Sequence, residues 1–187
     1  MGLRKFRHYN VGELVKHNLK GGVRALPVAY RGFRFRSRLE GRWAVFFDAI
    51  GIEYQYEPQG FQFDRGVCYL PDFYLPRVNT FAEVKPDLLT DNERWVCEQI
   101  VLATGRSFLY LEGPPDFRPY YCVSLDAGDL TAYTVSLDIG TYRKYYRDES
   151  RLFSCPSDED LEEENVSDEY REAVYLSRGC RFDGRGR

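Results

Sequence analysis

Histidine is almost absent from this chain of 187 residues, which contains only His8 and His17. Both lie in the N-terminal segment, away from any acidic cluster. The sequence therefore argues against histidine-bound metal centres and against hydrolases with a Ser-His-Asp or Cys-His arrangement. No glycine-rich phosphate loop precedes a helix, which argues against a nucleotide-driven motor. The sequence leaves acidic side chains as the candidate catalytic or metal-binding groups.

Paired cysteines and long apolar runs are missing as well. The five cysteines are scattered and no Cys-x-x-Cys occurs, so neither a zinc ribbon nor a disulfide framework is indicated. No run approaches the length of a membrane span, and the first residues lack the apolar core of a signal peptide. We therefore expect no membrane partner.

Charge is segregated along the chain, although the net charge is only −3. Residues 1–43 contain eleven Lys or Arg and two acids, whereas residues 148–172 contain eleven acids and two Arg. A basic block of this kind is typical of a phosphate-binding surface, and a solvated basic face is the alternative. Within it, Arg31-Gly-Phe-Arg34-Phe-Arg36 alternates Arg with aromatic residues, as an extended nucleic-acid-binding segment or an edge strand would.

Two runs in the middle of the chain bring carboxylates together. Tyr69–Leu75 and Phe81–Lys85 alternate polar and apolar residues, which predicts two strands joined by a turn at Pro76–Asn79. Glu83 and Lys85 then share one face of their strand, and Asp72 lies on the antiparallel neighbour. Adjacent carboxylates repel each other, and a hard divalent cation such as Mg²⁺ or Mn²⁺ relieves that repulsion.

A third carboxylate, Glu40, lies near the start of a predicted helix. Ser37 and Glu40 have the spacing of a capping box, and Trp43, Phe46 and Phe47 follow at helical spacing until Gly51 ends the helix. Glu40 therefore has two interpretations: a capping residue that needs no metal, or a first-turn carboxylate that faces the site.

The order of these parts resembles the PD-(D/E)XK nuclease superfamily over about Arg36 to Tyr110: Glu40 on a helix, Pro71-Asp72 on a strand, then Glu83-Val84-Lys85. The resemblance implies an α/β fold with a mixed central sheet flanked by helices, the restriction-endonuclease-like core. It also implies Mg²⁺, or Mn²⁺, held by Asp72, Glu83, the Val84 carbonyl and Glu40, with Lys85 orienting the attacking water. Glu83-Val-Lys-Pro86 looks particularly like transposase endonuclease subunits and compact phage or prophage nucleases.

The remaining sequence predicts the organisation of the chain. We expect a basic arm (1–35), a nuclease-like domain (36–147) and an acidic, partly disordered tail (148–187). Further expected elements are a helix at 92–104, a buried strand at 107–111, an edge hairpin at 120–125 and 131–137, and one short helix near Tyr170 and Val174.

The function expected from this resemblance is metal-dependent hydrolysis of phosphodiesters in DNA, with RNA as an open alternative. Arg31, Arg34, Arg36 and Arg38 are the predicted nucleic-acid-binding residues. The competing hypothesis is a noncatalytic nucleic-acid-binding or protein-interaction protein that keeps the fold. A partner protein or a homodimer is compatible with either. The expected location is the cytoplasm of a bacterial host or phage-infected cell.

Overall fold

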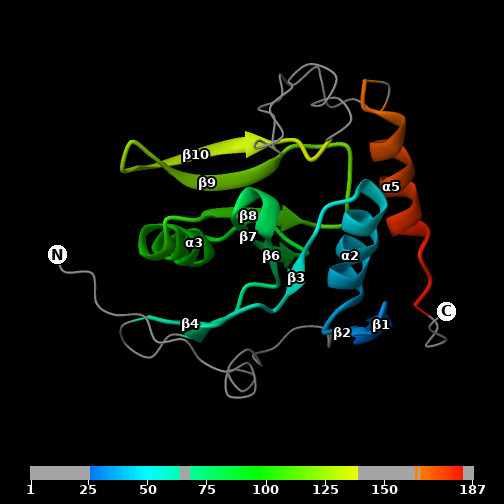
Figure 1. Cartoon of the computed structure of the whole chain (residues 1–187), viewed down its shortest axis with the longest axis horizontal. Helices are drawn as coiled ribbons and strands as arrows, with labels where there is room; N and C mark the ends of the chain where they lie inside the picture. Colours follow the sequence, from blue (N-terminus) through cyan, green and yellow to red (C-terminus); the bar gives the residue numbers. More distant parts are fainter. Residues whose placement is uncertain (1–25, 64–67, 139–162, 164, 183–187) are drawn as a thin grey trace.

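The computed structural model describes residues 26–63, 68–138, 163 and 165–182, which form three α-helices around a six-stranded sheet (Figure 1). The helices are α2 (Arg38–Ile50), α3 (Asp91–Thr104) and α5 (Asp168–Gly179). The strands are β1 (Val28–Tyr30), β2 (Phe33–Phe35), β3 (Gln55–Tyr56), β4 (Phe61–Gln62), β5 (Cys68–Tyr69), β6 (Phe73–Leu75), β7 (Thr80–Lys85), β8 (Ser107–Glu112), β9 (Tyr120–Asp126) and β10 (Asp129–Val135). Each helix in these ranges is too short or too polar to be a candidate membrane span.

The central sheet has the strand order β10-β9-β8-β7-β6-β3 and is mixed. Strands β7 and β8 are parallel because α3 connects them as a crossover, and the other neighbours in the sheet are antiparallel. The remaining strands form two short ribbons, β1-β2 and β4-β5. The predicted α/β class with a mixed central sheet is therefore confirmed, and β9-β10 is the predicted edge hairpin.

Helices cover both faces of the sheet, because alternate side chains of its strands point to opposite sides. On β7, Ala82 and Val84 pack in the core cluster that contains α2 and α5, whereas Phe81 packs in the cluster that contains Cys97 and Ile100 of α3. Figure 1 shows α2 and α5 side by side, apart from α3. The polar residues of β7 that follow Phe81 with period two, Glu83 and Lys85, therefore belong to the α3 side.

Local sequence signals set the ends of the two helices next to the predicted site. The Ser37 hydroxyl accepts a hydrogen bond from the Glu40 amide at 3.1 Å, and Gly51 ends α2 in the left-handed conformation. Thr90 begins α3 with a complete capping box to Glu93. Pro76–Val78 forms a 3₁₀ turn (η2) between β6 and β7, as the sequence predicts.

Part of the segment predicted as a basic arm packs in the core of the domain. The hairpin β1-β2 lies within 1–35, yet Val28 and Phe35 are 6% and 0% exposed and belong to the same core cluster as α2. The arm therefore contributes to the folded domain from about residue 28, because its alternating aromatic and apolar residues find a core face. Residues 1–25 of the predicted arm lie outside the described residues.

Part of the segment predicted as a tail, 148–187, also packs on the domain. The expected short helix is present as α5, but it packs along α2 as part of the domain rather than as a solvated tail (Figure 1). Tyr170, Ala173 and Val174 are each at most 1% exposed. Arg178, in the last turn of α5, donates to the Pro115 carbonyl and pairs with Asp116. The acidic residues 148–162 lie outside the described residues.

The contribution of α5 can be tested at Tyr170, whose ring meets Phe46 edge-on at 5.4 Å and whose hydroxyl donates to the Asp116 carbonyl at 2.8 Å. We expect Tyr170→Ala to lower the free energy of unfolding by about 3–5 kcal/mol, since it leaves a large cavity and removes one of the two hydrogen bonds to the Asp116 carbonyl. Leu176→Ala on the same helix is the control, because Leu176 is 59% exposed and should change stability by about 0.5 kcal/mol or less. Equal losses in urea unfolding would contradict a core role for α5.

Candidate functional site

Three carboxylates lie at neighbouring positions along β3, β6 and β7: Glu57 directly follows β3, Glu83 lies within β7, and Asp72 directly precedes β6 rather than lying within the strand predicted for Tyr69–Leu75. The registers pair Tyr56 with Phe73 and Phe73 with Ala82, so the next position in each pairing places Asp72 between Glu57 and Glu83. The Glu57 amide donates to the Asp72 carbonyl at 2.8 Å, which continues the β3-β6 ladder by one residue. Directly opposite residues of a sheet project from the same face. The sheet therefore assembles the predicted pair Asp72 and Glu83, and it adds Glu57.

Asp72 is at the centre of this row and is only 3% exposed. Its Oδ2 accepts the Val84 amide at 2.8 Å, and its Oδ1 accepts a hydrogen bond from Nη2 of Arg36, also at 2.8 Å. Burial raises the pKa of Asp72 well above its usual range, the neighbouring carboxylates Glu83 and Glu40 raise it further, and Arg36 and the Val84 amide offset part of the rise. A group in this situation gains strongly from additional positive charge.

Glu83 is equally buried and has one oxygen in use. Its Oε1 pairs with Nζ of Lys85 at 2.9 Å, whereas Oε2 has no hydrogen-bond partner among the described residues. Burial raises the pKa of Glu83, and the Lys85 ammonium and the Tyr69 hydroxyl counteract this in part. A buried carboxylate oxygen without a partner is costly, and it marks a position where a cation or water gains from binding.

Lys85 shares the face of Glu83, as the spacing of two predicts. Burial lowers the pKa of Lys85, but the carboxylates of Glu83 and Asp72 outweigh that effect and raise the pKa above its ordinary value. The ammonium therefore keeps its proton. This electrostatic setting favours orientation and charge stabilisation over proton abstraction as the role of Lys85.

Glu40 is 7% exposed and occupies a different part of the site. Its Oε2 accepts the Tyr56 hydroxyl at 2.6 Å and the Arg36 amide at 3.1 Å. The predicted capping box is thus half formed: Ser37 caps the Glu40 amide, but the carboxylate reaches Arg36, one residue before the cap. Arg36 links this carboxylate to the strand row, because its backbone contacts Glu40 and its side chain contacts Asp72.

Arg36 differs from the other predicted nucleic-acid-binding residues. Its Nε lies 2.7 Å from Oε1 of Glu57 and its Nη2 lies 2.8 Å from Oδ1 of Asp72, while 43% of the side chain stays exposed. Burial lowers the pKa of Arg36, but Asp72, Glu57 and Glu40 together raise it, so the guanidinium remains charged. Arg36 therefore contributes a permanent positive charge to the acidic row.

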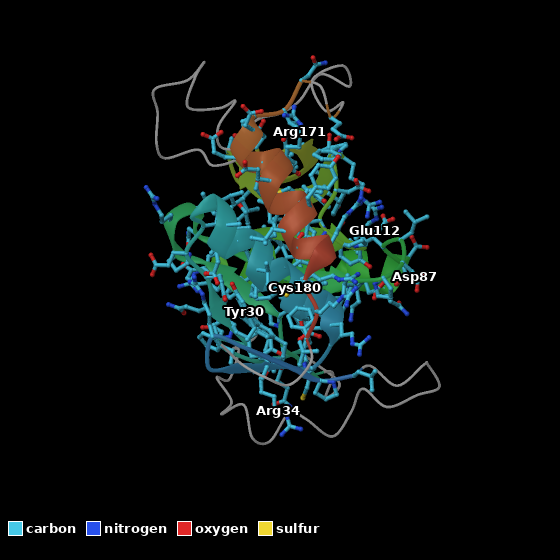
Figure 2. The ribbon with its side chains drawn as sticks, turned by 90° about the vertical axis from the view of Figure 1, so that its right-hand side faces the viewer. Tyr30, Arg34, Asp87, Glu112, Arg171 and Cys180 are labelled. Carbon is cyan, nitrogen blue, oxygen red and sulfur yellow. The ribbon has the colours of Figure 1, made fainter. Side chains whose placement is uncertain are left out.

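The other three arginines lie on the surface. Arg31 is 67% exposed at its side chain and pairs with Asp48 at 3.4 Å. Arg34 and Arg38 are exposed, and Figure 2 shows Arg34 projecting outward from the β1-β2 hairpin. These positions are accessible to a large polyanion, because the guanidinium groups are already exposed to solvent.

Sequence reasoning missed Glu57, Tyr56 and Tyr69 as members of the site. Glu57 follows β3 with a positive φ of 46°, an uncommon conformation for a residue with a side chain. Burial raises its pKa, and the contact with Arg36 offsets part of the rise. The signal that could have found Glu57 is the strand register, because pairing the run that ends at Tyr56 with the run after Asp72 places Glu57 beside Asp72.

The donor set matches a hard divalent cation in its chemistry, although no three acidic, His or Cys side chains form a ready metal-binding group in the described parts of the chain. Asp72 and Glu83 supply carboxylate oxygens on one face, and the free Oε2 of Glu83 is directed at no other partner there. Arg36 occupies the Asp72 oxygen that would complete such a group. The residues fit Mg²⁺ or Mn²⁺ once that contact is exchanged.

The support that Tyr56 gives to Glu40 can be measured. Tyr56→Phe removes a hydrogen bond to a buried carboxylate, and we expect a loss of about 1.5–3 kcal/mol in unfolding free energy. Tyr74→Phe is a matched control, because the Tyr74 hydroxyl bonds the neutral amide of Asn79 at an exposed site and should cost about 1 kcal/mol or less. Equal losses in the two variants would show that Glu40 gains nothing particular from Tyr56.

Comparison with known proteins adds no family to these observations. No protein-family model matches the chain, and no curated protein matches it significantly.

Proposed function

We propose that this protein is a metal-dependent nuclease of the PD-(D/E)XK type with a restriction-endonuclease-like core, and that it hydrolyses phosphodiester bonds in DNA. The observation that carries the proposal is the row formed by Glu57 after β3, Asp72 before β6 and Glu83 within β7, with Lys85 beside Glu83. Buried carboxylates next to a charged lysine are costly to stability, and such arrangements cluster at functional sites.

The roles follow from the contacts. Asp72 and Glu83, with the Val84 carbonyl, would hold Mg²⁺ or Mn²⁺. Glu40 would influence the same site through Arg36, whose backbone it contacts. The cation, when bound, supplies Lewis-acid stabilisation of phosphate charge and a more acidic water. Lys85 keeps its proton, so it orients the nucleophile and stabilises charge on the phosphate. The buried row excludes bulk water, which strengthens each of these electrostatic effects.

The exposed arginines provide the route for the substrate. Arg31 and Arg34 precede Arg36 and Arg38 begins α2, so phosphates bound by these side chains would lie near Arg36 and the row that it contacts. Contacts of this kind bind the backbone and carry no sequence information, which favours weak sequence specificity.

A second candidate is a noncatalytic nucleic-acid-binding protein that keeps the same fold. One observation favours it: Arg36 already neutralises Asp72 and Glu57 in the place where a cation would bind. The two candidates separate when Mg²⁺ and Mn²⁺ are titrated against labelled single-stranded, duplex, branched and RNA substrates. Cleavage of any of them supports the nuclease, whereas binding without cleavage under every condition supports the second candidate.

We expect Asp72→Ala and Glu83→Ala each to reduce metal-dependent cleavage to background, since each removes a proposed metal ligand that no neighbouring carboxylate replaces. Circular dichroism and thermal unfolding should report a folded protein in both variants. Asp126→Ala is the control, because Asp126 is an exposed carboxylate at the far end of β9. Cleavage at the rate of the unmodified protein in either site variant would remove the metal-site assignment.

Lys85→Ala should lose most of the cleavage rate, by about 10²-fold or more, while Mg²⁺ affinity is kept or improved. The reason is that Lys85 neutralises Glu83 and competes with a cation for it. Isothermal titration of Mg²⁺ measures the affinity separately from the rate. A collapse of Mg²⁺ binding in this variant would make Lys85 a structural residue.

Replacing Arg34 and Arg38 together by Ala should weaken duplex binding and flatten its salt dependence. Each lost phosphate contact removes about 0.9 units from the slope of log K against log salt, so the double variant should lose about two units. Binding isotherms at several salt concentrations test this, and Arg77→Ala, an exposed arginine in η2, serves as the control. An unchanged slope would identify the arginine-rich segment as a solvated face.

A further inference from the structure

Arg36 is the only described cation that contacts two carboxylates of the row at once. Its guanidinium joins Asp72 and Glu57 at 2.8 and 2.7 Å, and the exposed part of its side chain, 43%, faces solvent. Arg36 therefore contacts Asp72 and Glu57 while part of its side chain stays open to a ligand from solvent.

The net charge of the groups around Arg36 would be balanced by one divalent cation. The four carboxylates Glu40, Glu57, Asp72 and Glu83 face two cations, Arg36 and Lys85, so the formal excess is two negative charges. Oε2 of Glu83, on a residue that is 4% exposed, has no hydrogen-bond partner among the described residues, while the Lys85 ammonium and the Tyr69 hydroxyl act on the same carboxylate. A divalent cation bound there through Asp72 would lie beside the guanidinium, and two positive charges at such short range repel strongly.

We propose that Arg36 is a displaceable counter-ion: its guanidinium and the divalent cation are alternative partners of Asp72, and a nucleic-acid phosphate takes the guanidinium when the cation enters. This inference rests on the proposed function, since it assigns a regulation to the same site. A guanidinium suits the exchange because it binds carboxylate and phosphate with the same forked geometry. Arg34 and Arg38 beside it hold the phosphate backbone within reach.

The exchange couples two ligands. If the phosphate draws Arg36 from Asp72, the cation binds more tightly, and by linkage the cation also increases the affinity for the phosphate. The metal-free protein then keeps its carboxylates partly neutralised by Arg36 and Lys85, and the full site forms only when nucleic acid and cation are both present. Glu57 is the positioning residue in this scheme, because it contacts Nε of the guanidinium while Asp72 contacts Nη2.

The first experiment measures Mn²⁺ binding to the full chain without nucleic acid, by the loss of the free Mn²⁺ resonance in electron paramagnetic spectra. Arg36→Met keeps the apolar stem and removes the charge, and we expect it to bind Mn²⁺ about tenfold more tightly, within the range usual for coupled sites. Arg38→Met is the control for a general loss of positive charge and should change the affinity far less. Thermal unfolding verifies each fold; if Arg36→Met does not fold, Arg36→Lys replaces it, and its shortened reach should give an intermediate gain.

The second experiment measures duplex DNA binding in EDTA. Glu57→Gln releases one anchor of Arg36 and should raise the affinity severalfold more than Glu53→Gln, which removes an exposed carboxylate four residues earlier. In the Arg36→Met background this excess should vanish, because no guanidinium is left to release. An excess that persists there would overturn the exchange.

The outcomes separate this inference from the proposed function. Unchanged or weaker Mn²⁺ binding by Arg36→Met, with metal-dependent cleavage intact in the unmodified protein, would overturn the exchange alone. An absence of Mn²⁺ binding in every variant would overturn the metal site itself and the exchange with it. Tighter binding by Arg36→Met together with the vanishing excess supports the exchange.

Discussion

The candidate site depends on one hydrogen bond between the Asp72 side chain, next to β6, and the backbone of the antiparallel strand β7. Oδ2 accepts the Val84 amide, so the carboxylate takes part in the β6-β7 edge. This bond fixes Asp72 beside Glu83 and leaves Oδ1 for one further partner. Arg36, Glu57 and, through Arg36, Glu40 are arranged around that remaining oxygen. A slip of one residue in this register would turn Asp72 to the other face and disperse the row.

Patterns of short range predict much of this arrangement. The period of two in Phe81–Lys85 places Glu83 and Lys85 on one face, and the turn residues Pro76–Asn79 require an antiparallel neighbour. Helix ends follow from Ser37, Gly51 and Thr90, whose side chains or conformational freedom act locally. These features depend on residues only a few positions apart, and the sequence contains that information directly.

Features that depend on distant residues could not be predicted in the same way. Glu57 joins the row only through the pairing of β3 with β6, and Arg36 turns toward the row only because Asp72 and Glu57 meet there. The acidic composition around α5 suggests a solvated segment, yet Tyr170 and Val174 form an apolar stripe that α2 buries. The overall composition of a segment does not reveal whether its few apolar residues lie on one face of a helix, and that face decides whether the helix is buried.

The place of α5 in the chain has a consequence for the order of folding. It follows every strand of the sheet in sequence, and it packs on α2, which precedes nearly all of them. Contacts of such long range form late, because closing the intervening loop costs entropy before the packing is gained. The β6-β7 hairpin, which brings Asp72 beside Glu83, is local and can form early, whereas the packing of α2, which carries Glu40, is complete only when α5 docks. A chain in which α5 has not docked would therefore have an incompletely packed helix beside the site.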